Sequence, residues 1–517
     1  MSDGRVFLVG AGPGAYDLIT MRAADVLARA DLVIYDYLVN PELLRLAPLD
    51  AELVFAGKKG GGQKTLGQDA INKMLIAQAR KGKSVVRLKG GDPFIFGRGG
   101  EEALALARAR VPFEVIPGVT SAIAAPAFAG IPLTHREHGS FVAFVTGHED
   151  ESKRGASLIP WKSLAEAARA GGTLVLLMAT ARMHSTLKRL IDGGLDGKTP
   201  AVAVEWGTVA AQKTVAGTLA TLADACARER LGAPATIVVG RSAALRKDLA
   251  WAERLPLFGR RIVVTRARAA ASTFGAELRR LGAEVIEFPT IETVPPSSYD
   301  ELDRAIEGID RFDWLIFTSA TGADAFIERL KALRRDIRSI GRVSIAAIGP
   351  ATAERLREHA LDVAAMPAEF RAEQIFEAIG AERIAAARFL IPRAEVARDV
   401  LPNMLLTGGA REVLVVPAYR TIRPKNENAA RVRELAAERA IDLVAFTSSS
   451  TVDNFCAMVG KQASGIEAAV IGPITAATAR ARGFRVAVRP REYTIPALVE
   501  AIRTHFKAGR RRKQASA

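Results

Sequence analysis

A glycine-rich turn near the start of the chain is the first place where residue types and spacing suggest chemistry. The segment VGAGPG at 9–14 follows a β-rich run and precedes a helical stretch, and Asp36 ends the next β-rich run. Glycines at such a turn let the backbone approach a pyrophosphate, and an acid about 20 residues further on can bind a ribose hydroxyl. The turn alone leaves two interpretations open, an NAD(P) site or a purely structural connection.

Three further loops are rich in glycine and polar residues, at 86–102, 116–122 and 130–136. The glycines at 90–91 would let backbone amides approach a ligand, and Asp92 could accept hydrogen bonds from hydroxyls or bind a cation. A nucleotide-dependent redox domain has no need of these loops. The pattern therefore favours a different ligand.

Together these motifs resemble those of the tetrapyrrole methylases, most closely uroporphyrinogen-III C-methyltransferase, over residues 1–250. The segments YDYLV at 35–39, GKK at 57–59 and VTGH at 145–148 add to the resemblance. It implies S-adenosylmethionine as methyl donor, bound between two α/β subdomains. It also implies a homodimer formed through this half of the chain.

The resemblance implies site residues position by position. The donor contacts would be Pro13, Gly90, Gly91, Asp92, Ile95, Thr120, Ser121, Met178 and Gly207. Asp36 would accept a proton from the substrate, and Lys58 would donate a proton or anchor a carboxylate. For both residues a solvated surface role stays open. The basic residues that could pair with substrate carboxylates, or carry structural charges, are Arg87, Lys89, Arg98 and Arg136.

Several positions depart from the residues usual in this family. Ala15 stands where Asp is usual, Tyr37 where Arg is common, and 177–179 reads LMA rather than Tyr-Met-Gly. A histidine often found near 61–63 is missing. These positions touch the expected pocket, so weaker donor binding or a later corrin intermediate as substrate stays open.

Three histidines, His135, His138 and His148, raise the question of a metal. No cysteine lies near them in the sequence, and their THR and TGH settings belong to the methylase loops. We therefore expect no metal.

The second half of the chain contains an internal duplication. FTS occurs at 317–319 and at 446–448, and IGP occurs at 348–350 and at 471–473, each IGP opening a helix rich in Ala and Thr. Two similar α/β lobes are expected.

Residues 259–508 resemble uroporphyrinogen-III synthase. Besides the duplication, the resemblance rests on motifs at 264–266, 391–393, 417–421 and 493–495. It implies closure of linear hydroxymethylbilane to uroporphyrinogen III, in which the enzyme folds the substrate and protects cationic intermediates from water. Tyr419 would assist departure of the hydroxyl, although a structural role stays open.

Substrate binding in this half is expected from two arginines and from hydroxyls at strand ends. Arg266 and Arg393 would pair with carboxylates. The hydroxyl donors would be Thr318, Ser319, Thr447, Ser448 and Ser449. Helix N-cap roles stay open for these hydroxyls.

The elements that must position these residues alternate in type, which predicts an α/β fold throughout. We expect the methylase with its two subdomains at 1–250 and the two-lobed synthase at 259–508. The smaller units would be a linker at 251–258, lobe 1 at 259–292 with 423–508, lobe 2 at 293–422, and a basic disordered tail at 509–517.

Composition excludes several classes of protein. The apolar runs of this 517-residue chain, such as 173–179, are shorter than the roughly 20 residues of a membrane span, and the start shows no signal-peptide pattern. Cys226 and Cys456, one in each half, do not form a disulfide framework. With so few cysteines we expect a protein of the reducing cytoplasm. The net charge of +16 comes without interleaved aromatic residues, so we expect no nucleic-acid partner.

Together the two resemblances imply a bifunctional enzyme of tetrapyrrole synthesis. It would make uroporphyrinogen III and methylate it twice to precorrin-2, for sirohaem or cobalamin. A methylase half acting on a later corrin intermediate and, in a different class, an NAD(P)-dependent oxidoreductase remain as alternatives.

Overall fold

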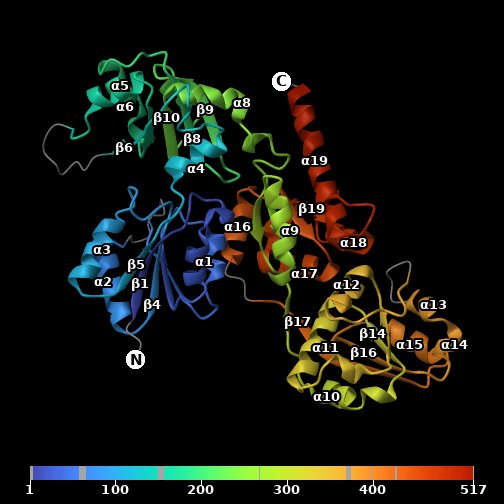
Figure 1. The fold of residues 1–517 in the computed structure, drawn as a ribbon. Helices are drawn as coiled ribbons and strands as arrows, with labels where there is room; N and C mark the ends of the chain where they lie inside the picture. The colour runs from blue at the N-terminus through green and yellow to red at the C-terminus, as the bar shows by residue number, and fades with distance from the viewer. Residues whose placement is uncertain are drawn as a thin grey trace.

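The structure is a computed structural model, in which four five-stranded sheets are arranged in two pairs (Figure 1). The residues described are 4–57, 66–148, 157–266, 268–367, 374–397, 399–424 and 428–515. The expected α/β architecture, with two subdomains in the first half and two lobes in the second, is confirmed.

The first subdomain is a parallel sheet with the strand order β3-β2-β4-β1-β5. Its strands are β1 (Arg5–Gly10), β2 (Leu32–Tyr35), β3 (Glu52–Phe55), β4 (Ser84–Lys89) and β5 (Phe113–Ile116). The central strands are buried along most of their length because helices cover both faces of the sheet. These helices are α1 (Met21–Leu27), α2 (Gln68–Arg80) and α3 (Gly99–Arg108).

The second subdomain is a mixed sheet with the order β6-β7-β10-β8-β9. Its strands are β6 (Val142–Thr146), β7 (Thr173–Leu177), β8 (Pro200–Glu205), β9 (Lys213–Thr218) and β10 (Ala235–Val239). Its helices are α4 (Ser121–Phe128), α5 (Trp161–Arg169), α6 (Met183–Asp192), α7 (Leu222–Arg228) and α8 (Arg246–Leu249). Helix α4 lies close to the sheet because its buried face is alanine, with Ala125 packed in one cluster with Val204 and Val238.

Lobe 1 of the second half is a parallel sheet with the order β12-β11-β18-β19-β20. Its strands are β11 (Arg261–Val264), β12 (Glu284–Glu287), β18 (Leu443–Phe446), β19 (Glu467–Val470) and β20 (Arg485–Val488). Its helices are α9 (Arg268–Arg280), α16 (Ala429–Ala437), α17 (Ser449–Val459), α18 (Pro473–Ala481) and α19 (Ile495–Ala515). Helix α19 includes residues up to Ala515, and residues 516–517 lie outside the described residues, so the disordered tail expected at 509–517 stays a prediction.

Lobe 2 has the order β13-β17-β16-β14-β15. Its strands are β13 (Glu292–Val294), β14 (Trp314–Phe317), β15 (Ser344–Ala347), β16 (Arg388–Ala394) and β17 (Glu412–Ile422). Its helices are α10 (Asp300–Glu307), α11 (Ala320–Ala332), α12 (Pro350–Glu358), α13 (Ile375–Ile379), α14 (Ala381–Ile384) and α15 (Val400–Thr407). Strands β13 and β17 pair antiparallel where the chain leaves lobe 1 and returns to it (Figure 1).

The first half contacts lobe 1 through buried charges. Glu42 is 3% exposed, and its carboxylate pairs with Arg45 at 3.2 Å and with Arg431 of α16 at 3.3 Å. Arg45 also pairs with Glu287 of β12 at 3.0 Å. Figure 1 shows α16 beside α1, in agreement with these contacts.

Candidate active sites

The loops that follow β1, β4 and β5 meet in the first half at one edge of the sheet. A Cβ atom on Gly118 would lie 2.2 Å from the carbonyl oxygen of Gly91 and 2.7 Å from the Cα of Gly10. Glycine is therefore required for the backbones to come so close. The carboxyl edge of a parallel sheet is also where ligands bind in open α/β folds.

Asp92 ties these loops together. Its Oδ1 accepts hydrogen bonds from the backbone N–H groups of Phe94 (2.8 Å) and Ile95 (3.2 Å), and its Oδ2 accepts one from Gly118 (3.0 Å). The carboxylate is thus engaged by protein backbone, which gives Asp92 a positioning role. A direct contact of Asp92 with the donor remains a prediction.

The second subdomain contacts these loops, and we call the region between the two subdomains the cleft. The backbone N–H of Ala15 donates to Thr208 Oγ1 at 3.0 Å, and the ring of Tyr37 lies 6.0 Å from that of Trp206. A Cβ atom on Gly207 would lie 2.4 Å from that of Ala125 on α4. The loop after β8 therefore lies against both α4 and the glycine turn after β1.

The expected donor contacts all occupy this cleft region. They follow β1, β4, β7 or β8, or they begin α4, and they are Pro13, Gly90, Gly91, Asp92, Ile95, Thr120, Ser121, Met178 and Gly207. Phe96, Met178, Trp206 and Thr208 adopt positive φ angles, between 45° and 76°. Such angles in non-glycine residues are costly and cluster at functional sites, which supports the location.

Asp36, the expected proton acceptor, lies at the end of β2 beside the glycine loop of β4. The backbone N–H of Leu38 donates to its Oδ1 at 3.1 Å, and that of Gly90 lies 3.4 Å from both oxygens. Its side chain is 25% exposed and therefore accessible from the cleft. Lys58, its expected partner, lies outside the described residues.

A buried group of charges lies behind Asp36. Arg87 and Lys89 on β4 are each 4% exposed and contact Oε1 of Glu102 at 3.2 and 3.1 Å, and Glu102 is fully buried. Of the two roles left open for Arg87 and Lys89, their burial and their pairing with Glu102 favour structural charges over contacts with substrate carboxylates. Glu102 was not among the predicted residues. Two cations alternating with apolar residues in an otherwise buried strand were the signal that a buried acid must face them.

The other two basic residues proposed for substrate carboxylates are exposed. Arg98 forms an ion pair with Glu101 at 2.7 Å. Arg136 lies in an exposed position on the loop before β6.

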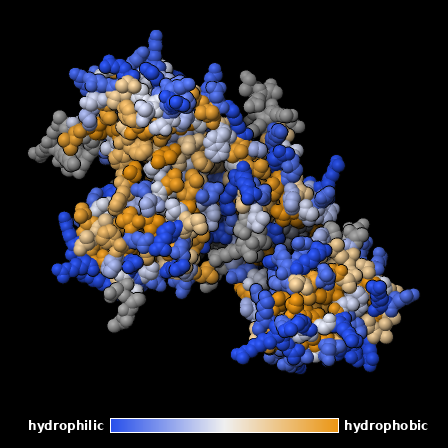
Figure 2. Space-filling model, viewed as in Figure 1, coloured by the Kyte–Doolittle hydropathy of each residue, from blue (hydrophilic) through white to orange (hydrophobic). Residues whose placement is uncertain are grey.

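Exposed apolar side chains lie on the loops that border this region. They come from the loops after β2, β4 and β7 and are Tyr37, Leu38, Phe94, Ile95, Phe96 and Met178. Figure 2 shows hydrophobic residues at the surface where the two subdomains meet. An apolar rim of this kind is typical of a binding site for a large organic molecule.

The turn before β6 brings together His135, Glu137 and His138, with possible ligand atoms within 4.8 Å of one another. The Nδ1 of His135 accepts a hydrogen bond from the backbone of Glu137 at 3.1 Å, and the two imidazole rings lie 4.7 Å apart. One possible ligand atom, the Nδ1 of His135, is therefore already occupied by a hydrogen bond. The expectation of no metal stays a prediction.

In the second half, Tyr419 and Ser319 meet at the carboxyl edge of lobe 2. The two hydroxyl oxygens are 3.1 Å apart, and Ser319 Oγ also accepts the backbone N–H of Gly322 at 3.0 Å. Ser319 is thus the N-cap of α11 and at the same time a partner of Tyr419. Thr318 precedes it at the end of β14.

Lobe 1 has hydroxyl residues at the same place, between the end of β18 and the start of α17. Ser448 caps α17 in a reciprocal arrangement with Thr451, and Ser449 Oγ accepts a hydrogen bond from Thr478 of α18 at 2.9 Å. Thr447 lies between β18 and this cap. The N-cap alternative therefore holds for Ser319 and Ser448.

The two predicted arginines differ in their surroundings. Arg393 forms an ion pair with Asp399. Arg266, half-buried after β11, has no hydrogen bond or ion pair with another described residue, and burial lowers the pKa of its guanidinium. An incompletely solvated cation without a partner is well suited to bind a carboxylate.

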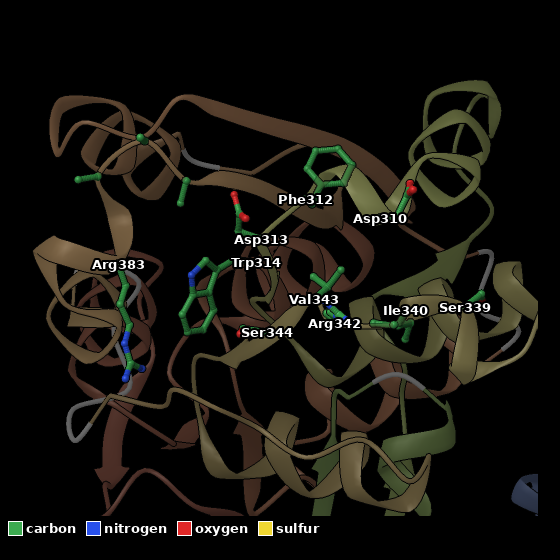
Figure 3. A pocket seen from close by; sticks show the side chains of 14 residues that line it. Asp310, Phe312, Asp313, Trp314, Ser339, Ile340, Arg342, Val343, Ser344 and Arg383 are labelled. Carbon is green, nitrogen blue, oxygen red and sulfur yellow. The ribbon is translucent and has the colours of Figure 1, made fainter.

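A hollow of about 780 Å³ lies at the opposite, amino edge of lobe 2. Figure 3 shows Asp313, Trp314 and Ser344 in this hollow, with Arg383 on one side. Asp313 and Trp314 precede or begin β14, whereas Thr318 and Ser319 follow it. The hollow is therefore separate from the candidate site at the carboxyl edge.

Comparison with known proteins identifies the chain as an enzyme of tetrapyrrole metabolism with two different halves. The family model "Tetrapyrrole (Corrin/Porphyrin) Methylases" matches residues 5–223, and "Uroporphyrinogen-III synthase HemD" matches residues 272–500. The "Porphyrin biosynthesis protein HemD" of Ruminiclostridium josui is 37% identical over 504 residues, which cover 97% of this chain and 98% of that protein. The chain belongs to the family of porphyrin biosynthesis proteins that join a tetrapyrrole methylase to a uroporphyrinogen-III synthase.

Other relatives match the first half. The uroporphyrinogen-III C-methyltransferase of Bacillus subtilis (strain 168) is 46% identical over 254 residues, covering 48% of this chain and 95% of that protein. The siroheme synthase of Chromobacterium violaceum is 47% identical over 251 residues, and only 52% of its length is matched. A solved structure of uroporphyrin-III C-methyl transferase from Thermus thermophilus, complexed with S-adenosyl homocysteine, is 38% identical, with a TM-score of 0.40 over 47% of this chain and all of that one.

Both family resemblances expected from the sequence are confirmed, and the dinucleotide interpretation of the glycine turn is replaced by that of a methylase. No helix in the described ranges has the length and apolar character needed to cross a membrane.

Proposed function

We propose that the chain cyclises hydroxymethylbilane to uroporphyrinogen III and then transfers two methyl groups to it from S-adenosylmethionine, giving precorrin-2 for sirohaem or cobalamin synthesis. The observation that carries the methylase part is the position of Asp36. Its accessible carboxylate lies where the glycine loops converge and beside an exposed apolar rim. The name of one relative, a uroporphyrinogen-III C-methyltransferase, supports uroporphyrinogen III as the substrate of the methylase half.

The methylase cleft suits a transfer that depends on alignment. When bound, S-adenosylmethionine supplies an electrophilic methyl group. The apolar rim would hold the macrocycle, and the backbone loops at Gly90–Asp92 and Thr120–Ser121 would hold the donor against it. As the methyl group is transferred the substrate gains positive charge, and the Asp36 carboxylate would accept the proton that is then released.

The synthase half would act by directing a hydroxyl proton. Because Ser319 Oγ accepts the N–H of Gly322, its own hydrogen can be donated to the oxygen of Tyr419. The Tyr419 O–H is then free to donate to the departing hydroxyl of the bilane. Arg266 would bind a substrate carboxylate, and the two lobes would hold the chain folded for ring closure.

A coupled assay tests both parts. The purified full chain is given enzymatically generated hydroxymethylbilane with and without S-adenosylmethionine, and the oxidised products are separated by isomer and mass. Type III isomer without donor and dimethylated product with donor are expected. Type I isomer throughout would exclude the synthase activity.

The same assay tests the alternative substrate for the methylase half. Type III isomer that is not methylated, together with methylation of a later corrin intermediate, would show that the departures at Ala15, Tyr37 and 177–179 have changed the substrate.

We further propose that the enzyme acts in the cytoplasm as a homodimer formed through its first half. Sedimentation of the full chain and of variants in that half tests the dimer.

A further inference from the structure

The buried acid Glu102 faces both cations of β4 through a single oxygen. Its Oε1 accepts from Arg87 Nε at 3.2 Å, from Lys89 Nζ at 3.1 Å and from Gln68 of α2 at 3.1 Å. Its Oε2 is buried and has no hydrogen-bond partner among the described residues. Burying a carboxylate is costly unless it is paired, and here the ion pairs of Oε1 with Arg87 and Lys89 offset that cost.

Arg87 connects this acid to the site. Besides Glu102, its guanidinium donates to the carbonyl oxygens of Ile34 (3.3 Å) and Leu88 (3.1 Å), which fix its plane between β2 and β4. Its Nη2 lies 3.7 Å from Oδ2 of Asp36. This distance is longer than that of a close charge-assisted hydrogen bond, which is about 2.7–2.9 Å.

We infer that Glu102 is a positioning residue for methyl transfer: by holding Arg87 and Lys89, it keeps Arg87 from forming a close pair with Asp36. The inference rests on the proposed role of Asp36 as proton acceptor. Among the described residues, the charged groups facing Asp36 are Arg87 and Lys89 of β4, with Glu102 of α3 behind them. The group is electrically balanced, with two acids and two cations.

Removal of the Glu102 charge would leave this group of side chains with a net positive charge. Arg87 would be free to move toward Asp36 and hold its carboxylate in the ionised form, so that Asp36 would accept a proton less readily. Burial, together with the nearby Arg87, already lowers the pKa of Lys89, and the ion pair with Glu102 opposes this lowering. An uncompensated cation would then remain beside the site.

The test compares Glu102→Gln with Glu101→Gln in the full chain. Glu101 is the preceding residue on α3, exposed and paired with Arg98, and serves as the matched control. For E102Q we expect kcat of methylation to fall by about 10- to 100-fold with little change in the KM for S-adenosylmethionine, and the acid limb of the kcat–pH profile to move to lower pH. E101Q should behave like the unaltered protein.

Two further measurements separate positioning from folding. Cyclisation by the same molecules should be unchanged, because the second half does not contain Glu102. The double variant Glu102→Gln with Arg87→Gln removes one charge of each sign, including the cation that would otherwise pair with Asp36, and should recover much of the lost kcat. A merely structural role predicts no recovery, because the double variant leaves the packing more altered.

The outcomes are distinct. Unaltered kcat and pH profile in E102Q, or a loss with no shift of the acid limb and no recovery in the double variant, would overturn the inference. Full methylation activity in Asp36→Asn would instead overturn the proposed role of Asp36. An inactive Asp36→Asn together with an unaffected E102Q would reject only the role of Glu102.

Discussion

The two candidate sites of this chain are built in contrasting ways. The methylase cleft is held by close glycine backbone contacts, strained non-glycine residues and a buried balance of charges. The synthase site consists of hydroxyl groups that also cap helices, in two lobes linked where β13 pairs with β17. One site has a fixed geometry, whereas the other offers hydrogen-bond donors on two separate sheets.

This difference corresponds to the chemistry proposed for each half. An in-line methyl transfer requires a donor, an acceptor carbon and a base at fixed distances, which a rigid and strained site provides. Cyclisation requires a flexible linear molecule to be folded and shielded from water, which hydroxyl groups on two lobes can do. Because both sites lie in one chain, each activity is an internal control for the other.

The largest effect is expected from Asp36→Asn. Loss of the proton acceptor should lower methylation by about 10²- to 10⁴-fold while cyclisation stays unchanged, because the carboxylate is replaced by an isosteric amide. Methylated and unmethylated uroporphyrinogen III are measured in the same reaction. An equal fall in both activities would show that the substitution acts through folding and would break the contrast between the halves.

A change in the rigid backbone should have the next largest effect. In Gly118→Ala the new Cβ would lie 2.2 Å from the carbonyl oxygen of Gly91, so the loops must separate. A shift of about 1 Å at a reacting site costs roughly 10²-fold in rate, and donor binding measured by calorimetry should weaken too. Gly100→Ala on α3 is the control, since nothing lies within 4 Å of its Cβ position.

Removal of the Tyr419 hydroxyl should have a smaller effect. Tyr419→Phe leaves Ser319 its bond to Gly322, so α11 keeps its cap, and cyclisation to the type III isomer should slow by about 10-fold or more. Tyr299→Phe in the same lobe is the control, because the Tyr299 ring packs against the Arg329 guanidinium and keeps that contact without its hydroxyl. Equal rates for the two variants would remove Tyr419 from the mechanism.

The sequence alone predicted the α/β class, the two joined families and the convergence of the donor loops, because glycine motifs and strand ends are local features. It did not predict that Arg87 and Lys89 face inward, since the acid that binds them is contributed by a helix 13 to 15 residues further along. Nor did it predict the contact of the first half with lobe 1, in which Glu42 meets Arg431 at a separation of 389 residues. Long-range pairing of charges depends on how sheets and helices pack, which periodicity does not contain.

The smallest effect is expected at the contact of Glu42 with Arg431. The connections between the parts of the chain differ as the two sites do. The first half is fixed to lobe 1 by Glu42, Arg45 and Arg431, whereas lobe 2 is attached through β13 and β17. Burial raises the pKa of Glu42, against the opposing effects of Arg45 and Arg431. Because the folded protein then binds a proton more readily than the unfolded chain, the contribution of Glu42 to stability is greatest at low pH and declines as pH rises above the ordinary glutamate value of 4.5.

Glu42→Gln removes this titration. We expect Glu42→Gln to lower the free energy of unfolding by about 1 kcal/mol near pH 4.5, with the deficit narrowing toward neutral pH. Calorimetric unfolding across this pH range measures it, with Glu52→Gln as control, because the ion pair of Glu52 with Lys83 is largely solvated and contributes little. A stability deficit that widens with pH would mean that the ionised form of Glu42 stabilises the fold. The contact of the first half with lobe 1 would then depend on ion pairing rather than on a buried, readily protonated acid.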